Sequence, residues 1–272
     1  MAAEEFGLAM GVGSQRAALE NPEMEDSFTV VREHAPPHAF LCGNLGIIQL
    51  RDKGIEWADK AVEMIDAQAL CIHLNPLQEA IQPEGDHDAA GCLDALQELC
   101  SSCRYPVIVK ETGCGISREC ARQLFAAGAS AVDVGGLGGT SWAAVEQFRA
   151  KNPLQQALGL HFADWGGIPT AVSVAEATLA GGPVIATGGL NSGTDIAKAM
   201  ALGAGLGGMA LALLPPAMDG YQSLCDKIHQ IQTEIRMSCY LTGSRNPSEL
   251  RNIRKYITGI TGEMLQYEEN KL

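Results

Sequence analysis

The stretch that decides the fold is Ala69 to Asp86, which reads ALCIHLNPLQEAIQPEGD. It opens with the apolar run Ala69-Leu70-Cys71-Ile72, which has the length of a strand. Pro76 ends that strand, and a Pro-Glu-Gly-Asp turn closes the loop behind it. Polar side chains lie between the two, at positions His73, Asn75, Gln78 and Glu79.

This arrangement indicates a buried strand that delivers polar groups to one end of a sheet. In parallel α/β folds the sites lie there, because the loops after the carboxyl ends of the strands face the ligand. Two carboxamides and a carboxylate beside an imidazole could position an anionic ligand and hold Mg²⁺, which prefers oxygen donors. The stretch contains no nucleophile paired with a base.

The composition favours one large α/β domain over residues 1–272, since the 272 residues are 46% hydrophobic and 19% charged. A net charge of −13 argues against binding to nucleic acid or to an acidic membrane surface, because both need Lys and Arg. Phosphate groups on a small ligand need only a few local donors. With no signal-peptide pattern and no apolar run of about 18 residues, we expect a soluble, cytoplasmic protein.

The nine cysteines are odd in number and scattered, which fits free thiols in a reducing compartment. Cys100-Ser-Ser-Cys103 could be a redox pair or half of a zinc site. No second pair follows at ligand spacing, so ordinary thiols are the favoured interpretation.

Other predicted strand ends carry candidate ligand-binding residues. Gly11-Val-Gly-Ser-Gln-Arg16 is a plausible anion cradle, with backbone N–H groups, Ser14 and the guanidinium of Arg16. Asn44 could bond a heterocycle, although an Asn that only stabilises a loop explains it equally well. Lys110 ends a strand that should be buried on both faces, which favours a ligand role, such as stabilising negative charge on a cofactor ring.

Two glycine-rich loops follow later strands. Thr140 and Ser141 come after Gly135-Gly-Leu-Gly-Gly139 and fit a helix N-cap, yet the glycines imply a backbone pressed against something flat or bulky. Thr187-Gly-Gly-Leu-Asn-Ser-Gly-Thr-Asp195 enters a helix, which is a phosphate-binding arrangement of glycines and free N–H groups.

Strands are expected near residues 6, 39, 69, 106, 131, 183 and 206, each followed by a helix-like segment. Residues 150–169 are expected to form a longer connection, and residues 218–242 and 247–257 the last two helices before a polar tail. The period is that of a βα barrel, and a closed barrel has eight strands. The predicted fold is therefore a TIM (β/α)8 barrel with the first strand missing and seven strands present.

The combination of several motifs resembles the type 2 isopentenyl-diphosphate isomerase family, over nearly the whole chain and in order. The motifs are MGVGSQR at 10–16, HLNPLQEAIQPEGD at 73–86, VIVKETGCGIS at 107–117, GGLGGTSW at 135–142, DWGGIPT at 164–170 and ATGGLNSGTDIAKAMALGA at 186–204. The family's N-terminal segment has no counterpart in residues 1–272, and Gly166-Gly167 holds one glycine more than the family pattern.

The resemblance implies a TIM barrel that binds FMN and Mg²⁺, uses NADPH as the reductant, and interconverts isopentenyl and dimethylallyl diphosphate as a homo-oligomer. It implies flavin contacts at Ser14, Asn44, Lys110 and Thr140. The FMN phosphate would be held by backbone N–H groups at Gly189, Leu190, Asn191, Ala210 and Leu211. The substrate diphosphate would meet Ser14, Gln15 and Arg16, with His73 and Asn75 nearby.

The resemblance further implies that Gln78 lies by the reacting alkene and that Glu79 holds Mg²⁺ against the diphosphate. Two alternatives stay open. One is a catalytically inactive flavin- or phosphate-binding remnant of that family. The other is a different FMN-dependent oxidoreductase, which ranks last because the expected His and Arg pair is not visible in the glycine-rich loops.

Overall fold

The structure is a computed structural model that describes residues 1–83 and 85–269. The chain divides into two compact units, each taken here by itself. The N-terminal unit comprises Met1–Ala80, Glu84–Lys110 and Gln123–Ala131. The C-terminal unit comprises Ile81–Pro83, Glu111–Arg122 and Val132–Leu272.

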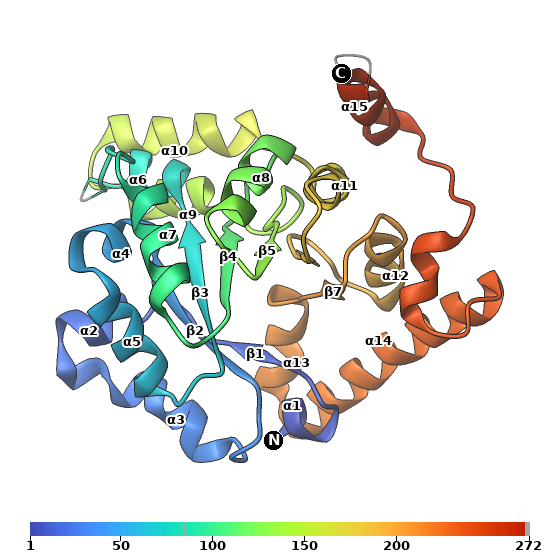
Figure 1. Cartoon of the computed structure of the whole chain (residues 1–272), viewed down its shortest axis with the longest axis horizontal. Coiled ribbons are helices and arrows are strands. Elements are labelled where there is room, and N and C mark those ends of the chain that lie inside the picture. Colours follow the sequence, from blue (N-terminus) through green and yellow to red (C-terminus); the bar gives the residue numbers. More distant parts are fainter. Residues whose placement is uncertain (84, 270–272) are drawn as a thin grey trace. The chain divides into compact units, whose positions relative to one another are not determined.

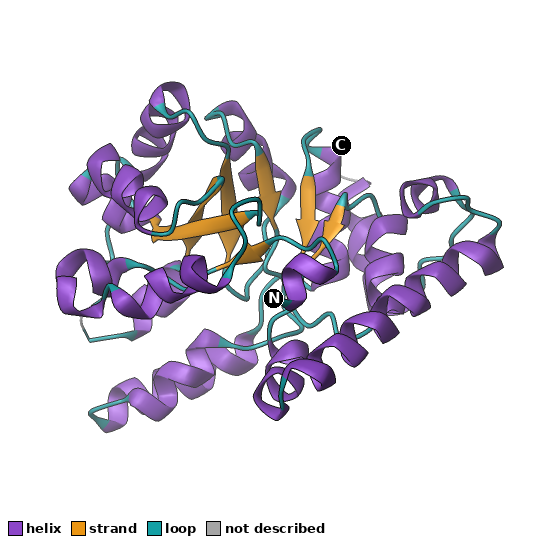
Figure 2. Ribbon diagram, turned by 90° about the horizontal axis from the view of Figure 1, so that it is seen from below, coloured by secondary structure: helices purple, strands orange, loops and turns teal. Residues whose placement is uncertain are grey.

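Seven strands follow one another in chain order in a single sheet, and each recorded pairing is parallel. Helices lie beside the strands in each unit (Figures 1 and 2). A parallel sheet with a helical connection after each strand is the architecture of a TIM barrel, here with one strand fewer than the closed form. The predicted fold class is confirmed. The strands are β1 (Met10–Gly11), β2 (Leu41–Gly46), β3 (Ala69–Leu74), β4 (Val107–Glu111), β5 (Ala131–Asp133), β6 (Val184–Ala186) and β7 (Leu206–Gly207).

The N-terminal unit is built around β2 and β3, which pair in register from Cys42 opposite Ala69 to Gly46 opposite His73. All six residues of β2 are buried, because α4 and α5 contact it and also β3 (Figure 1). Small residues on α5, Ala58 and Ala61, are fully buried and permit this close packing. The helices that belong wholly or mainly to this unit are α1 (Ala2–Glu5), α2 (Arg16–Glu20), η1 (Pro22–Met24), α3 (Asp26–His34), α4 (Ile47–Lys53), α5 (Ile55–Met64), α6 (Pro76–Ile81) and α7 (Cys92–Ser102), while α8 (Arg118–Ala126) spans the boundary of the two units.

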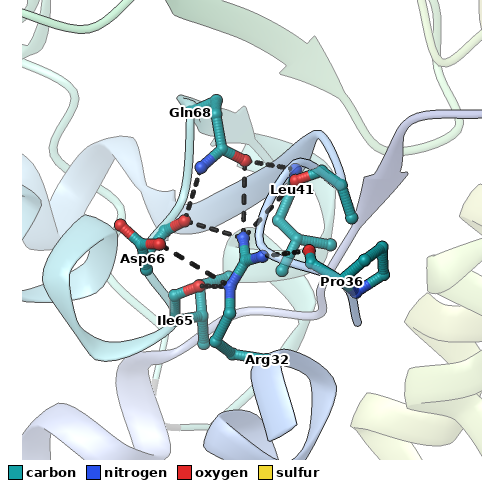
Figure 3. Close-up of polar contacts among 7 residues, drawn as sticks. Arg32, Pro36, Leu41, Ile65, Asp66 and Gln68 are labelled. Carbon is teal, nitrogen blue, oxygen red and sulfur yellow. Dashed lines mark hydrogen bonds and ion pairs between the residues drawn. The ribbon is translucent and has the colours of Figure 1, made fainter. Parts of the chain in front are cut away.

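Arg32, at the end of α3, ties that helix to the turn before β3 (Figure 3). Its guanidinium donates to the carbonyl oxygens of Ile65 at 3.0 Å, Pro36 at 3.0 Å and Asp66 at 2.8 Å. A guanidinium presents several donors in a fixed plane, so one side chain satisfies three carbonyl groups that no strand or helix pairs. This fixes the point at which β3 enters the sheet.

The C-terminal unit contains the last three strands and a helical layer in which α9 packs on α10 and α12 packs on α14. Ala197, Cys239 and Leu250 form a buried cluster where α12, α14 and η3 meet. The helices of this unit are α9 (Trp142–Arg149), α10 (Pro153–Trp165), α11 (Thr170–Leu179), α12 (Gly193–Ala201), η2 (Leu211–Leu213), α13 (Leu214–Asp219), α14 (Tyr221–Thr242), η3 (Pro247–Asn252) and α15 (Gly259–Glu269).

The prediction of a long connection at residues 150–169 is wrong, because α10 occupies most of it. Asn152 caps this helix by accepting a hydrogen bond from the backbone N–H of Gln155 at 3.0 Å. Gly159 lets α10 approach α9 closely, since a Cβ there would lie 2.8 Å from the Cα of Gln147. The Asn-Pro start followed by apolar residues was the sequence signal for this helix.

Three smaller differences concern element ends. The first strand lies at Met10–Gly11 rather than near residue 6. Only Pro247–Asn252 of the predicted helix 247–257 is helical, as a 3-10 helix, and α15 follows it. The predicted polar tail includes residues 270–272, and the turn after β3 includes Glu84; these lie outside the described residues. Across the described part of the chain, no helix is both long and apolar enough to cross a bilayer.

Candidate functional site

Asn44 on β2 and His73 on β3 are hydrogen-bonded to each other, with 2.8 Å between Asn44 Oδ1 and His73 Nδ1. The Nδ2 atom of Asn44 donates to the carbonyl oxygen of Val12 at 3.0 Å, which fixes the orientation of the carboxamide. Because a carboxamide oxygen only accepts, the network assigns the proton of His73 to Nδ1 and leaves Nε2 as an acceptor.

Burial, with a smaller contribution from the positive charge of Lys110, lowers the pKa of His73 to about 4. The imidazole is therefore neutral at pH 7. This electrostatic coupling also places the half-buried Lys110 of β4 in the surroundings of His73. The structure thus brings three of the predicted site residues together in the N-terminal unit.

Gln15 is fully buried, which the sequence did not indicate. Its Nε2 donates to the carbonyl oxygen of Ala61 at 2.8 Å, and its Oε1 accepts from the backbone N–H of Asn44 at 2.8 Å. Gly43 makes room for it, since a Cβ there would lie 3.1 Å from Gln15 Oε1. The predicted contact of the Gln15 side chain with a diphosphate does not fit this placement. Instead, Gln15 fixes the loop that carries its two neighbours.

Those neighbours, Ser14 and Arg16, lie at the start of α2 and are solvent-accessible. Arg16 Nε is 2.8 Å from Glu20 Oε1, one turn along the helix, and the two side chains are 42% and 48% exposed. An exposed ion pair at this spacing contributes only about 0.3–0.5 kcal/mol to stability, so the guanidinium can leave Glu20 for an anion that binds more strongly.

Asn75, Gln78 and Glu79 lie close together, but the last two are on a short helix and not in a loop. Helix α6 begins at Pro76, a residue well suited to the first helical position. Asn75 Nδ2 donates to Glu79 Oε1 at 3.0 Å and to Gln78 Oε1 at 3.4 Å. The Asn75 amide group thereby holds Gln78 Oε1 and the buried Glu79 carboxylate close together.

The turn after α6 is held from both sides. Glu79 Oε2 accepts the backbone N–H of Asp86 at 3.1 Å, and Arg51 of α4 pairs with Asp86 at 2.5 Å. Arg51 also donates to the carbonyl oxygen of Asp88, and its two carboxylate partners raise its pKa. Sequence reasoning missed Arg51. It lies in the last turn of α4, and nothing in the local sequence indicated that it anchors a distant loop.

The oxygen set around Glu79 fits Mg²⁺ in the form in which proteins most often bind it, through one or two carboxylates together with substrate phosphates. Each carboxylate oxygen accepts one N–H and keeps further lone-pair capacity. Among the residues that the structure describes, no group of three or more His, Cys, Asp or Glu side chains could hold a metal ion by itself. A cation here would need a phosphate ligand.

In the C-terminal unit, the glycine-rich loops after β5 and β6 pack backbone to backbone. A Cβ on Gly189 would lie 2.0 Å from the carbonyl oxygen of Gly138, and one on Gly188 would lie 2.1 Å from that of Gly136. Thr170 Oγ1 bridges the loops by donating to the carbonyl oxygen of Gly188 at 2.6 Å. The close neighbour that these glycines accommodate is therefore the adjacent loop.

Thr140 follows the first of these loops and is exposed. The N-cap of α9 is Ser141, whose hydroxyl accepts from the backbone N–H of Ala144, so Thr140 is not the capping residue. The carbonyl oxygen of Thr140 would lie 2.8 Å from a Cβ on Gly113, which brings the loop after β4 to it. The Thr140 side chain is left accessible to a ligand.

The N-terminus of α12 is largely occupied by the protein's own carboxylates. Asp195 accepts the backbone N–H groups of Asn191 and Ser192, both at 3.1 Å, and Glu234 of α14 accepts that of Gly193 at 2.6 Å. Within the described residues, no hydrogen bond engages the N–H groups of Gly189 and Leu190. These two, rather than Asn191, fit a phosphate.

Ala210 and Leu211 follow β7 and are exposed, so their backbone is accessible as the phosphate prediction requires. None of the nine cysteines forms a disulfide bond in the part of the chain that the structure describes. Burial raises the pKa of Cys103 and raises that of Cys100 to about 11, which disfavours thiolate chemistry at this pair.

Residues 63–255 match the family described as FMN-dependent dehydrogenase. The isopentenyl-diphosphate delta-isomerase of Methanoregula boonei is 56% identical over 268 residues, which cover 97% of this chain and 74% of that protein. The protein of the same name from Methanosarcina acetivorans is 52% identical over 97% of this chain and 73% of its own length. That from Archaeoglobus fulgidus is 48% identical over 98% and 76%.

Among solved structures, the chain is similar to a GMP reductase from Trypanosoma brucei in complex with guanosine 5'-triphosphate, with a TM-score of 0.55 and 19% identity. The match covers 80% of this chain and 46% of that one, so the chain spans about half of the reductase. At this identity the likeness supports the fold alone.

Proposed function

Because the chain belongs to the isopentenyl-diphosphate delta-isomerase family within the FMN-dependent dehydrogenases, we propose that it interconverts isopentenyl and dimethylallyl diphosphate with reduced FMN and Mg²⁺. The observation that carries the proposal is 56% identity across 97% of the chain to a protein of that name. NADPH would serve as the reductant of the flavin.

The substrate diphosphate would bind at Ser14 and Arg16, where the guanidinium exchanges Glu20 for the phosphate. Asn75 would add a carboxamide donor. His73 is neutral in the free chain, so it would act as a hydrogen-bonding group and not as a cation unless the diphosphate raises its pKa. The buried side chain of Gln15 would support this loop from within.

Mg²⁺ would bind between the Glu79 carboxylate and the diphosphate, so that one protein charge and the phosphates share the cation. The hydrogen bonds from Asn75 and Asp86 hold that carboxylate in one orientation. Gln78, one residue earlier on α6, would then lie at the alkene and help to orient it. A carboxamide is not a strong acid or base, which suits an orienting role.

FMN would contact Ser14, Asn44, Lys110 and Thr140, with the Lys110 ammonium stabilising negative charge on its ring. Bound in its reduced form, it would supply the proton-transfer chemistry. Its phosphate would be held by backbone N–H groups, chiefly Gly189 and Leu190, with Ala210 and Leu211 beside them. The Asn191 N–H would be available only if Asp195 released it.

We also propose a homo-oligomeric, cytoplasmic enzyme. Nine cysteines without a disulfide bond among the described residues support a reducing compartment. Met237, Tyr240 and Leu241 of α14 are 57%, 84% and 77% exposed, and an apolar helix face of this kind suits a contact between copies. Light scattering on a size-exclusion column would give the mass, and a purely monomeric chain would contradict the oligomer.

Titration of the purified chain with FMN tests the cofactor assignment. We expect a yellow protein that retains flavin through gel filtration. A folded chain that stays colourless after incubation with excess FMN would contradict the proposal. A yellow chain that does not convert isopentenyl diphosphate would instead support the inactive flavin-binding alternative.

A further inference from the structure

Glu111, the last residue of β4, is buried to 5% exposure beside the predicted flavin contact Lys110. Its Oε2 atom accepts three successive backbone N–H groups, those of Gly113 at 2.6 Å, Cys114 at 2.5 Å and Gly115 at 3.2 Å. Successive N–H groups that converge in this way form an anion-binding concavity. Here the anion is a side chain of the same loop.

The backbone shape that Glu111 holds is one that only glycine adopts readily. Gly113 has φ +141° and Gly115 has φ +78°. Without the carboxylate, the N–H groups of Gly113 and Cys114 would lose their acceptor in a partly buried turn, which is costly, whereas the N–H of Gly115 also donates to the carbonyl oxygen of Gly135 at 3.2 Å. Burial raises the pKa of Glu111, and backbone hydrogen bonds from Cys114, Gly113, Thr112 and Gly115 oppose that shift by favouring the ionised form.

This loop touches two other loops of the C-terminal unit. Gly113 lies against Thr140, as a Cβ on it would be 2.8 Å from the Thr140 carbonyl oxygen. The carbonyl oxygen of Cys114 accepts the backbone N–H of Ile168 at 2.8 Å. Gly115 also lies against Ile168, because a Cβ on Gly115 would be 2.6 Å from the carbonyl oxygen of Ile168. A displaced 112–115 loop would therefore displace Thr140 and the start of α11.

We propose that Glu111 is a positioning residue for flavin binding: its carboxylate fixes the 112–115 loop and thereby sets the places of Thr140 and the loop at Ile168. This inference rests on the proposed function, because it assumes that FMN binds at Thr140. Glu111 does not itself contact the cofactor.

The test compares FMN dissociation constants and flavin absorption spectra of Glu111→Asp, Glu111→Gln and the unaltered chain. Because the hydrogen bonds from Gly113, Cys114 and Gly115 converge on Oε2, the carbonyl oxygen of Gln can replace that atom, whereas Asp is shorter by one methylene and cannot reach. We expect Glu111→Asp to weaken FMN binding by about tenfold or more and to shift the flavin spectrum, and Glu111→Gln to change binding by less than about threefold.

Glu146→Asp is the matched control, since Glu146 is a carboxylate on α9 with 3% exposure that pairs with Arg149. It should lower the melting temperature without changing FMN affinity. If Glu111→Asp bound FMN as tightly as the unaltered chain, the positioning role would be overturned while the proposed function stood. An unaltered chain that did not bind FMN would overturn both.

Discussion

The neutral state of His73 can be tested through the pH dependence of stability. In the folded chain its pKa is about 4, against an ordinary value of 6.5. The folded protein therefore binds this proton less tightly than the unfolded chain does, so acid favours unfolding. The contribution of His73 to stability is complete above pH 6.5 and is lost as the pH falls towards 4.

The magnitude follows from the shift of about 2.5 pKa units. At about 1.4 kcal/mol per unit, protonation of His73 costs the folded state about 3 kcal/mol by pH 4. The physical sources are the desolvation of a buried cation and its repulsion by Lys110, in that order.

The assay is urea denaturation of the unaltered chain and His73→Gln at pH 7, 5.5 and 4. Other titrating groups are common to both, so the difference between their unfolding free energies isolates the imidazole. We expect that difference to fall by about 3 kcal/mol from pH 7 to pH 4. A difference that is constant over this range, or a ring proton resonance of His73 that titrates near pH 6.5, would refute the reasoning.

Two further substitutions test the site. Glu79→Gln should abolish isomerase activity yet leave FMN bound, since it removes the charge proposed to hold Mg²⁺. The control is Glu56→Gln, which changes an exposed carboxylate on α5. If Glu79→Gln retained activity, Glu79 would be excluded as the metal ligand. Gly189→Ala should lower the melting temperature and weaken FMN binding, because its Cβ would lie 2.0 Å from the Gly138 carbonyl oxygen at φ +79°. Such a backbone clash costs about 2–4 kcal/mol, and unchanged flavin affinity would show that this loop does not face the phosphate.

The order of the strands could be predicted from the sequence, because most strands contain a short apolar run with glycine or proline close behind it. The family resemblance is confirmed by the relatives. The strand predicted from Ala69 onward is confirmed up to the residue before Asn75, since Ala69–Leu74 is a strand with buried apolar residues. Local signals of this kind depend on residues adjacent in the chain, so they can be read without the fold.

The missed features all depend on contacts between distant segments. Gln15 resembles a surface residue of an anion-binding loop, and only the carbonyl oxygen of Ala61 gives it a buried partner. The sequence alone suggests that the N–H groups at the start of α12 can bind a ligand. In the structure Glu234, 41 residues further along the chain, accepts the N–H of Gly193. Glycine runs indicate that the backbone packs closely against a neighbour, but they do not identify that neighbour. Here the neighbour is another glycine-rich loop.

The central claim is that this chain is an FMN-dependent isomerase of isopentenyl diphosphate. The most direct measurement is the formation of dimethylallyl diphosphate from isopentenyl diphosphate by the purified chain, with and without FMN, in the presence of Mg²⁺ and NADPH. We predict that product forms only when FMN is present. A folded, FMN-saturated chain that forms no dimethylallyl diphosphate under these conditions would contradict it.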